Sequence, residues 1–243
     1  MSGKNLSGQV AIVTGASRGI GKAISLALAA EGMNLALTAT QIGNLSEVLD
    51  LVRSLGVRAE PFACDLANWR EIPRLVNDIT ACFGSLDVLV NNAGYSVRAS
   101  LVETAPEDLE RCMQVNAMAP FVLCQKLFPF LCRSQQATVI NIGSVVAFKG
   151  YEQQSAYGAS KHALLGLSKV MALEWKKYGI RVHSINPGAV DTEMIRQMRP
   201  DLDPQGMIGT EDIADLIVFL LTHRGRAVID DIHMRRATGD PWY

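Results

Sequence analysis

The sequence predicts an α/β protein built on one doubly wound, mostly parallel sheet with helices on both faces. Short apolar segments rich in β-branched residues alternate along the 243-residue chain with longer segments whose apolar residues repeat at helical spacing. The short segments are apolar on both faces, and the helices between them supply the cover that both faces need. We expect a single domain over residues 1–243, because α/β folds of this length need not divide.

The first half of the chain shows this alternation most plainly. Residues 9–14 form a short apolar segment that stops at a glycine-containing loop, which indicates a buried strand. Residues 20–31 carry apolar side chains at helical spacing, and Gly32 follows as a helix-ending glycine. The same features predict strands at 34–40, 58–64 and 86–91, with helices at 45–55 and 69–83.

The second half continues the pattern with longer helices. Residues 106–133 are mostly helical in periodicity, although Pro120 and Pro129 interrupt the segment. Residues 156–178 form another long helix, which Gly179 ends. The remaining predicted elements are strands at 138–142 and 181–186, a helix at 210–221 and a last strand at 227–234.

The composition argues against several classes of function. The net charge is −1 and no run of Lys or Arg forms a basic stripe, so we expect no nucleic-acid partner. The five cysteines include no Cys-x-x-Cys pair, which argues against a disulfide framework or a metal site and favours a reducing, cytoplasmic compartment. Neither a signal peptide nor an apolar run of transmembrane length is present, so we expect no membrane partner.

A glycine-rich loop joins the first predicted strand to the first predicted helix. Residues 14–21 read Thr-Gly-Ala-Ser-Arg-Gly-Ile-Gly. Gly15 permits a sharp turn, Gly19 lets the backbone approach a pyrophosphate, and Gly21 lets the helix pack closely on the sheet. Free N–H groups at the helix start can then bind phosphate oxygens. A tight turn without a ligand is the alternative, but this position in the chain favours dinucleotide binding.

The TGxxxGIG spacing of this loop resembles that of the short-chain dehydrogenase/reductase family. Other motifs of that family follow in order along the chain: Asn91-Asn92-Ala93-Gly94, Asn116, Ser144, Tyr157 with Lys161, and Pro187-Gly188 with Thr192. The second predicted strand resembles that of the 3-oxoacyl carrier-protein reductases. The resemblance implies a Rossmann-type fold, a nicotinamide cofactor, and hydride transfer that interconverts a small ketone or aldehyde and an alcohol.

The resemblance also implies which residues contact the cofactor. They lie in the glycine loop, at the ends of the predicted strands and on the helix at 156–178: Gly15, Ser17, Arg18, Gly19, Ile20, Gly21, Thr40, Asp65, Leu66, Asn92, Ala93, Gly94, Tyr157, Lys161, Pro187, Gly188, Val190 and Thr192. Asp65 matches the family residue that receives the adenine amino group. Capping of the following helix is its alternative role, and both roles can hold together.

The end of the second predicted strand bears on the choice between NADP and NAD. Residues 38–41 read Thr-Ala-Thr-Gln and lack the Asp or Glu that binds the ribose 2′-hydroxyl of NAD. A carboxylate would repel a 2′-phosphate, so its absence favours NADP. Arg18 and Thr40 match the phosphate-binding positions of NADP-dependent family members, and Arg18 can make a charge-assisted contact. The alternative is that Arg18 faces solvent and NAD binds without an acidic partner.

Four residues form the expected reacting centre. Tyr157 and Lys161 are four residues apart in a helical segment and therefore share one face. We expect the Lys161 ammonium to lower the pKa of Tyr157, which suits acid–base catalysis. Ser144 can hydrogen-bond the substrate oxygen from a strand end. By the resemblance, Lys161 also binds the nicotinamide ribose, while Asn116 bends its helix and holds a water that extends a proton path from Lys161.

Three segments are expected to shape the substrate site, again by the resemblance. They are residues 95–99, residues 145–154 and a lid at about residues 189–209. The methionines and isoleucine of the lid suit an apolar substrate, although a short helix that buries its apolar face is the alternative. Arg98, Lys149 and Arg196 could attract an anionic substrate, but exposure to solvent is the simpler explanation for each.

The C-terminal segment departs from the family. Many members end the last strand with Asp-Gly-Gly, whereas this chain reads Val-Ile-Asp-Asp-Ile-His-Met-Arg-Arg over residues 228–236. Trp242 and Tyr243 are apolar enough to pack on a neighbouring subunit, and the resemblance implies a homotetramer or homodimer.

A non-catalytic NADP-binding sensor or scaffold is an alternative on the same fold. An extended-family epimerase or dehydratase is a third possibility, but the chain lacks its glycine spacing and large C-terminal region.

Overall fold

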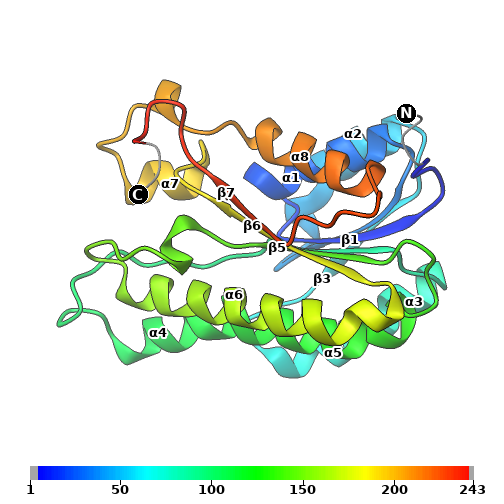
Figure 1. Ribbon diagram of the computed structural model, residues 1–243, viewed down its shortest axis with the longest axis horizontal. Helices are drawn as coiled ribbons and strands as arrows, with labels where there is room; N and C mark the ends of the chain where they lie inside the picture. The colour runs from blue at the N-terminus through cyan, green and yellow to red at the C-terminus, as the bar shows by residue number, and fades with distance from the viewer. Residues whose placement is uncertain (1–4, 241–243) are drawn as a thin grey trace.

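The computed structural model describes residues 5–240, which form one seven-stranded sheet (Figure 1). The strands are β1 Val10–Thr14, β2 Asn34–Ala39, β3 Ala59–Ala63, β4 Val88–Asn91, β5 Thr138–Ile142, β6 Arg181–Pro187 and β7 Asp231–Met234. Their spatial order is β3-β2-β1-β4-β5-β6-β7, and every neighbouring pair runs parallel. The predicted doubly wound α/β fold is confirmed.

Helices cover both faces of the sheet. They are α1 Gly19–Ala30, α2 Ser46–Ser54, α3 Ile72–Phe83, α4 Pro106–Met113, α5 Ala119–Leu131, α6 Ser155–Trp175, α7 Glu193–Met198 and α8 Thr210–Thr222. Figure 1 shows α1, α2 and α8 on one face and α3, α4, α5 and α6 on the other. The short α7 lies beyond the end of β6, beside the C-terminal part of the described chain.

Each face of the sheet has its own apolar core. On one face, Ile24 and Leu28 of α1 and Ile213 of α8 are fully buried in a single cluster with the strand side chains. On the other face, Leu123 and Leu127 of α5 belong to a second buried cluster. Burial of one such side chain contributes roughly 1.5–3 kcal/mol. Two packed layers therefore fix the strand ends in space.

The chain adds β2 and β3 on one side of β1 and then returns to add β4 on the other side. Strand β1 pairs with β2 on one side and with β4 on the other. The connections that leave the two neighbouring strands diverge, and a crevice opens at the carboxyl ends of the strands. The glycine loop follows β1 and residues 92–94 follow β4, so both segments border this crevice.

The expectation of a last strand over residues 227–234 is wrong for its first half, because β7 begins at Asp231. The ring of His183 hydrogen-bonds the carbonyl of Ile229 at 2.6 Å, and residues 227–230 are exposed. That carbonyl is thus satisfied by a side chain and not by a ladder bond. Regular pairing with β6 starts where Ser184 faces Asp231.

The helix predicted over residues 106–133 is right in extent but not uniform. A π-helical turn, Gln114–Met118, joins α4 to α5. Pro120 lies in the first turn of α5, and Pro129 lies within α5. The irregular turn places Asn116 at its centre, a detail that helical periodicity does not predict.

No described helix is both long and apolar enough to cross a membrane. Trp242 and Tyr243, for which the sequence predicts a contact with a neighbouring subunit, lie outside the described residues.

Candidate active site

A cleft of about 920 Å³ opens at the carboxyl ends of the strands. Its walls include every residue predicted to contact the cofactor, from Gly15 in the glycine loop to Thr192 before α7. Ser144, Tyr157 and Lys161 line the same cleft. Of the predicted site residues, Asn116 alone does not line it.

The glycines of the loop let its backbone lie very close to neighbouring segments of the chain, and leave it open to a ligand. Gly15 has a φ of +63°, and a Cβ there would lie 2.9 Å from Cα of Ala93. A Cβ on Gly21 would lie 2.2 Å from the carbonyl oxygen of Gly15. Arg18 precedes α1 without a side-chain cap, and the first turn of α1 carries no acidic residue. The helix start therefore keeps N–H groups that can bind phosphate oxygens.

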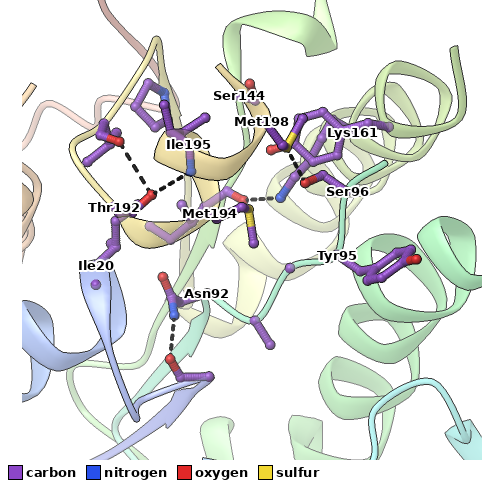
Figure 2. A pocket seen from close by; sticks show the side chains of 18 of the residues that line it. Ile20, Asn92, Tyr95, Ser96, Ser144, Lys161, Thr192, Met194, Ile195 and Met198 are labelled. Carbon is purple, nitrogen blue, oxygen red and sulfur yellow. Dashed lines mark hydrogen bonds between the residues drawn. The ribbon is translucent and has the colours of Figure 1, made fainter. Parts of the chain in front are cut away.

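Hydrogen bonds tie the ends of β1 and β4 together behind this loop. The hydroxyl of Thr14 accepts from the backbone N–H groups of Asn92 and Ala93, both at 3.0 Å. The side-chain amide of Asn92 donates to the carbonyls of Thr14 at 2.8 Å and Gly15 at 3.1 Å, and Figure 2 shows one of these bonds as a dashed line. Asn92 thus holds the glycine loop in place through its side chain and lines the cleft as well.

Two charged residues stand out on the wall of the cleft near the glycine loop. Arg18 forms an ion pair with Glu193 in the first turn of α7. Arg18 is therefore paired with a carboxylate, although 69% of its side chain is exposed to solvent. At the end of β3, the Asp65 carboxylate accepts a hydrogen bond from the Ala67 backbone N–H at 3.0 Å. Asp65 thus stabilises its own turn and lines the cleft, but the two helical segments that follow begin after Asn68 and Glu71, so its expected role as a helix cap is wrong.

The predicted reacting residues come from two elements. Ser144 follows β5, and its Oγ accepts from the Val146 N–H at 3.3 Å at the start of a short 3₁₀ turn, Val145–Ala147. Tyr157 and Lys161 lie one turn apart on α6, with Lys161 Nζ 5.7 Å from the centre of the Tyr157 ring. Lys161 is 3% exposed, and its Nζ donates to the carbonyl of Ile142 at 2.7 Å.

The expectation that Lys161 lowers the pKa of Tyr157 is wrong for the protein by itself. Burial raises the pKa of Tyr157 to about 12, and a hydrogen bond with Ser144 opposes that rise. Burial also lowers the pKa of Lys161 to about 8. Desolvation disfavours the charged form of each group and is the largest cause of both shifts. The prediction from the sequence took account of the charge of Lys161 but not of its burial.

Asn116 contacts the chain after β4 from the π-helical turn. Its Oδ1 accepts from the Tyr95 N–H at 2.8 Å, and its Nδ2 donates to the Tyr95 carbonyl at 2.7 Å and to Ser160 Oγ at 2.9 Å. Ser160 in turn donates to the carbonyl of Tyr157 at 2.8 Å. The Asn116 side chain therefore braces the loop after Gly94 against α6.

The segment that includes α7 covers one side of the cleft. Met194, Ile195 and Met198 line the cleft, and none of the residues of α7 is buried (Figure 2). The Ser96 hydroxyl contacts the sulfur of Met198, and Arg98 donates to the Met198 carbonyl at 2.8 Å. An apolar surface of α7 thus faces the cleft.

The three cations weighed for an anionic substrate all have contacts within the protein. Arg98 donates to the backbone, as described above, and Arg196 makes two hydrogen bonds to Asp191, at 2.7 and 2.9 Å. Lys149 lines the cleft, and its Nζ lies 5.7 Å from the centre of the Tyr151 ring.

Comparison with known proteins decides the family. The family model for short chain dehydrogenases matches residues 9–203. The chain belongs to the short-chain dehydrogenase/reductase family. It is 30% identical over 235 residues to the 3-oxoacyl-[acyl-carrier-protein] reductase of Thermotoga maritima, with 93% of this chain and 96% of that protein covered. It is 34% identical over 218 residues to carbonyl reductase family member 4 of Xenopus laevis, with 88% and 91% covered.

Two solved structures share nearly the whole fold. A metagenomic short-chain oxidoreductase in complex with NADP superposes with a TM-score of 0.85 at 34% identity, covering 96% of this chain and all of the other. An alcohol dehydrogenase from the archaeon Thermococcus sibiricus, complexed with 5-hydroxy-NADP, gives a TM-score of 0.88 at 26% identity, covering 97% and 99%.

Sequence reasoning missed one wall of this short-chain dehydrogenase's cleft. Four residues of the C-terminal segment line it: Arg235, Arg236, Gly239 and Asp240. The Arg235 guanidinium donates to three backbone carbonyls of its own turn, which shapes the segment. The family motifs end well before this segment, and no periodicity marks it, so only the departure from Asp-Gly-Gly could have drawn attention to it.

Proposed function

We propose that this protein is an NADP(H)-dependent carbonyl reductase or alcohol dehydrogenase, with Tyr157 as its general acid and base. The observation that carries the proposal is the convergence of Ser144, Tyr157 and Lys161 in the cleft that the glycine loop borders. A hydride donor and a proton donor must reach the same carbonyl group, and one cleft serves both needs. The enzyme names among its relatives support the same class.

The residues present fit a dinucleotide. The uncapped start of α1 and the close contacts of Gly15 and Gly21 suit a pyrophosphate. Thr40 and Asp65 lie on the cleft wall where the ribose and adenine would lie, and residues 38–41 carry no carboxylate. When bound, the nicotinamide supplies or accepts the hydride. Two similar solved structures contain NADP or a derivative of it, which supports NADP over NAD.

Tyr157 is set up as a proton donor. With its pKa at about 12, Tyr157 is protonated at neutral pH and can protonate a carbonyl oxygen as hydride arrives. The Ser144 hydroxyl holds that oxygen and shares its developing charge. For the reverse reaction the phenolate must form. A positive charge on Lys161, and the positive charge that the oxidised cofactor brings, favour that phenolate.

Asn116 is the fourth residue of the proposed reacting centre, and it contacts α6 at Ser160, next to Lys161. Its side chain is committed to Tyr95 and Ser160, so it fixes the π-helical turn and the start of the substrate loop. Proton replacement at Tyr157 then runs through Lys161 and a water held at that turn. π-Helical turns often occur at functional sites, in keeping with this role.

Residues 189–209 are proposed as a lid over the substrate. Met194, Ile195 and Met198 give the cleft an apolar wall, and flexible methionine side chains can adapt to substrates of varied shape. The lid contacts the loop after β4 through Met198, and it contacts the glycine loop through Arg18 and Glu193. An uncharged, partly apolar ketone or alcohol suits this wall.

A homo-oligomer is proposed in addition, as the family resemblance implies. Large apolar side chains are exposed on the outer helices, including Phe121 of α5 and Leu173 of α6. Single exposed apolar side chains are common on protein surfaces, so the proposal of an oligomer rests on the family resemblance. Light scattering tests the state directly, and a monomer at micromolar concentration contradicts it.

Two measurements test the proposed function. Titration of tryptophan-to-nicotinamide energy transfer with NADPH and with NADH measures cofactor affinity and preference. An absorbance screen of ketones, aldehydes and 3-oxoacyl thioesters then measures NADPH oxidation. Tight NADPH binding with turnover is expected. Tight binding without turnover of any carbonyl would favour a sensor or scaffold over an enzyme.

A further inference from the structure

A short turn carries the proposed substrate-binding hydroxyl. Ser144 begins the 3₁₀ turn Val145–Ala147, and Phe148 ends it. Ser144 is 9% exposed, and its backbone N–H needs a fixed partner because the strand ladder of β5 ends at Ile142. The position of Ser144 Oγ therefore depends on what holds the two ends of this turn.

Asn186 of β6 holds the first end. Its Oδ1 accepts from the Ser144 N–H at 3.2 Å, and the side chain is fully buried. A Cβ on Gly143 would lie 1.9 Å from that oxygen, so the amide fits directly against the backbone before Ser144. Only a glycine at position 143 leaves room for this contact.

Asp231 of β7 fixes the orientation of the Asn186 amide. The Nδ2 of Asn186 donates to Asp231 Oδ1 at 2.5 Å and to Ser184 Oγ at 3.0 Å. An ionised carboxylate only accepts hydrogen bonds, whereas a serine hydroxyl can donate or accept. Asp231 therefore forces Nδ2 toward β7 and leaves Oδ1 facing the Ser144 N–H. Without that carboxylate, Ser184 alone would tolerate either amide orientation.

His233 of β7 holds the second end of the turn. Its ring stacks on Phe148 with 3.9 Å between ring centres and 10° between planes. Its Nε2 also lies 3.2 Å from Asp231 Oδ2. The same strand thus contacts the turn at Ser144, through Asn186, and at Phe148, by stacking. Figure 1 shows β7 at the edge of the sheet beside β6.

We propose that Asp231 and His233 are positioning residues that hold Ser144 Oγ at the substrate oxygen. They act through Asn186 and Phe148 and contact neither substrate nor cofactor. This inference rests on the proposed function, because it concerns the role of Ser144 in turnover. It gives a purpose to the Asp-Asp-Ile-His sequence by which this chain departs from the Asp-Gly-Gly of its family.

The test compares Asp231→Ala, Asp231→Asn and the neighbouring control Asp230→Ala in the full-length protein. Asp231→Ala should lower kcat about tenfold at unchanged NADPH affinity, because small displacements of a positioned group cost catalysis. Asp231→Asn keeps an oxygen that can accept from Asn186 and should recover most of the loss. Asp230→Ala should match the parent, since the backbone carbonyl of Asp230, which bonds to Ser184, is kept.

A double-mutant cycle separates positioning from general destabilisation. In a Ser144→Ala background, Asp231→Ala should change kcat by less than about twofold, because the group that it positions is already gone. Equal losses in both backgrounds would overturn the proposal, as would parental kcat in Asp231→Ala. If Asp231→Ala does not fold, His233→Ala takes its place, with the same expected dependence on Ser144. Parental turnover in Ser144→Ala alone would overturn the inference, because Ser144 would then have no role in turnover, whereas no turnover of any carbonyl by the parent protein would contradict the proposed function instead.

Discussion

Arg18 and Glu193 form an ion pair that joins the glycine loop to the first turn of α7. The side chains are 69% and 56% exposed, so the pair contributes about 0–1 kcal/mol. A 2′-phosphate that met Arg18 would compete with Glu193 for the same guanidinium, and its bidentate contact is the stronger of the two. Glu193 thus opposes the phosphate contact and at the same time ties the proposed lid to the cofactor site.

Glu193→Gln is expected to strengthen NADPH binding. Removal of the competing carboxylate frees Arg18, and the gain should be about two- to fivefold, as the modest value of an exposed pair allows. The affinity for NADH, which lacks the 2′-phosphate, should be unchanged. Fluorescence titration measures both. Glu47→Gln, which removes the partner of Lys22 outside the cleft, is the matched control. An equal change for both cofactors would show that Glu193 acts on something other than the phosphate.

Arg18→Ala is expected to have the opposite effect. Loss of a charged hydrogen-bonding partner should weaken NADPH binding by about ten- to one-hundredfold, while NADH affinity changes little. The same titration measures this difference. Equal weakening of both cofactors would place Arg18 at the pyrophosphate or in the fold, and not at a 2′-phosphate.

The stability of the protein should rise with pH between about 8 and 10.5 because of Lys161. The pKa of Lys161 falls from 10.5 in the unfolded chain to about 8 in the folded one. Between these values the unfolded state binds more protons, so rising pH favours the folded state. Tyr157 has the opposite effect between pH 10 and about 12, since its folded pKa is raised.

Lys161→Met isolates this contribution. Chemical denaturation at pH 7.5 and 9.5 gives the free energy of unfolding of each protein. The parent should gain stability relative to Lys161→Met as the pH rises from the first value to the second. A difference between the two proteins that does not change with pH would mean that Lys161 keeps an ordinary pKa despite its burial.

Asn116→Ala should lower the free energy of unfolding more than Gln114→Ala, a change in the same π-helical turn. It leaves the Tyr95 N–H without its partner and the Tyr95 carbonyl with only Cys112 Sγ at 3.8 Å, at a cost of about 2–4 kcal/mol. Gln114→Ala is the control, because its buried Oε1 has no hydrogen-bond partner among the described residues. Thermal or chemical unfolding ranks the two. A larger loss for Gln114→Ala would contradict the bracing role of Asn116.

The sequence predicts the sheet and most of the cleft because local signals suffice for both. Unbroken apolar strands need cover on both faces, which leads to a doubly wound sheet, and strand ends then meet at one edge. Gly15 and Gly21 sit where a side chain would clash, as their motif implies. Spacing along the chain brings Tyr157 and Lys161 together on α6 without any tertiary information.

The features that the sequence does not predict depend on the burial of side chains and on contacts between residues far apart in the chain. The rise in the pKa of Tyr157 follows from burial, which neither residue type nor spacing reveals. The partner of Arg18 lies 175 residues away, and Asp231 reaches Asn186 across 45 residues. The start of the last strand is set by a side chain, His183, that takes the place of a ladder bond at Ile229. Each depends on side chains that only folding brings together.

Tyr157→Phe tests the central claim most directly. The change removes one hydroxyl and keeps the ring, so NADPH affinity by fluorescence titration should match the parent. NADPH oxidation with the best carbonyl substrate should fall by about 10²- to 10⁴-fold, the usual contribution of a general acid. That result would establish Tyr157 as the proton donor. Parental turnover in Tyr157→Phe, with a folded protein and bound cofactor, would contradict the account.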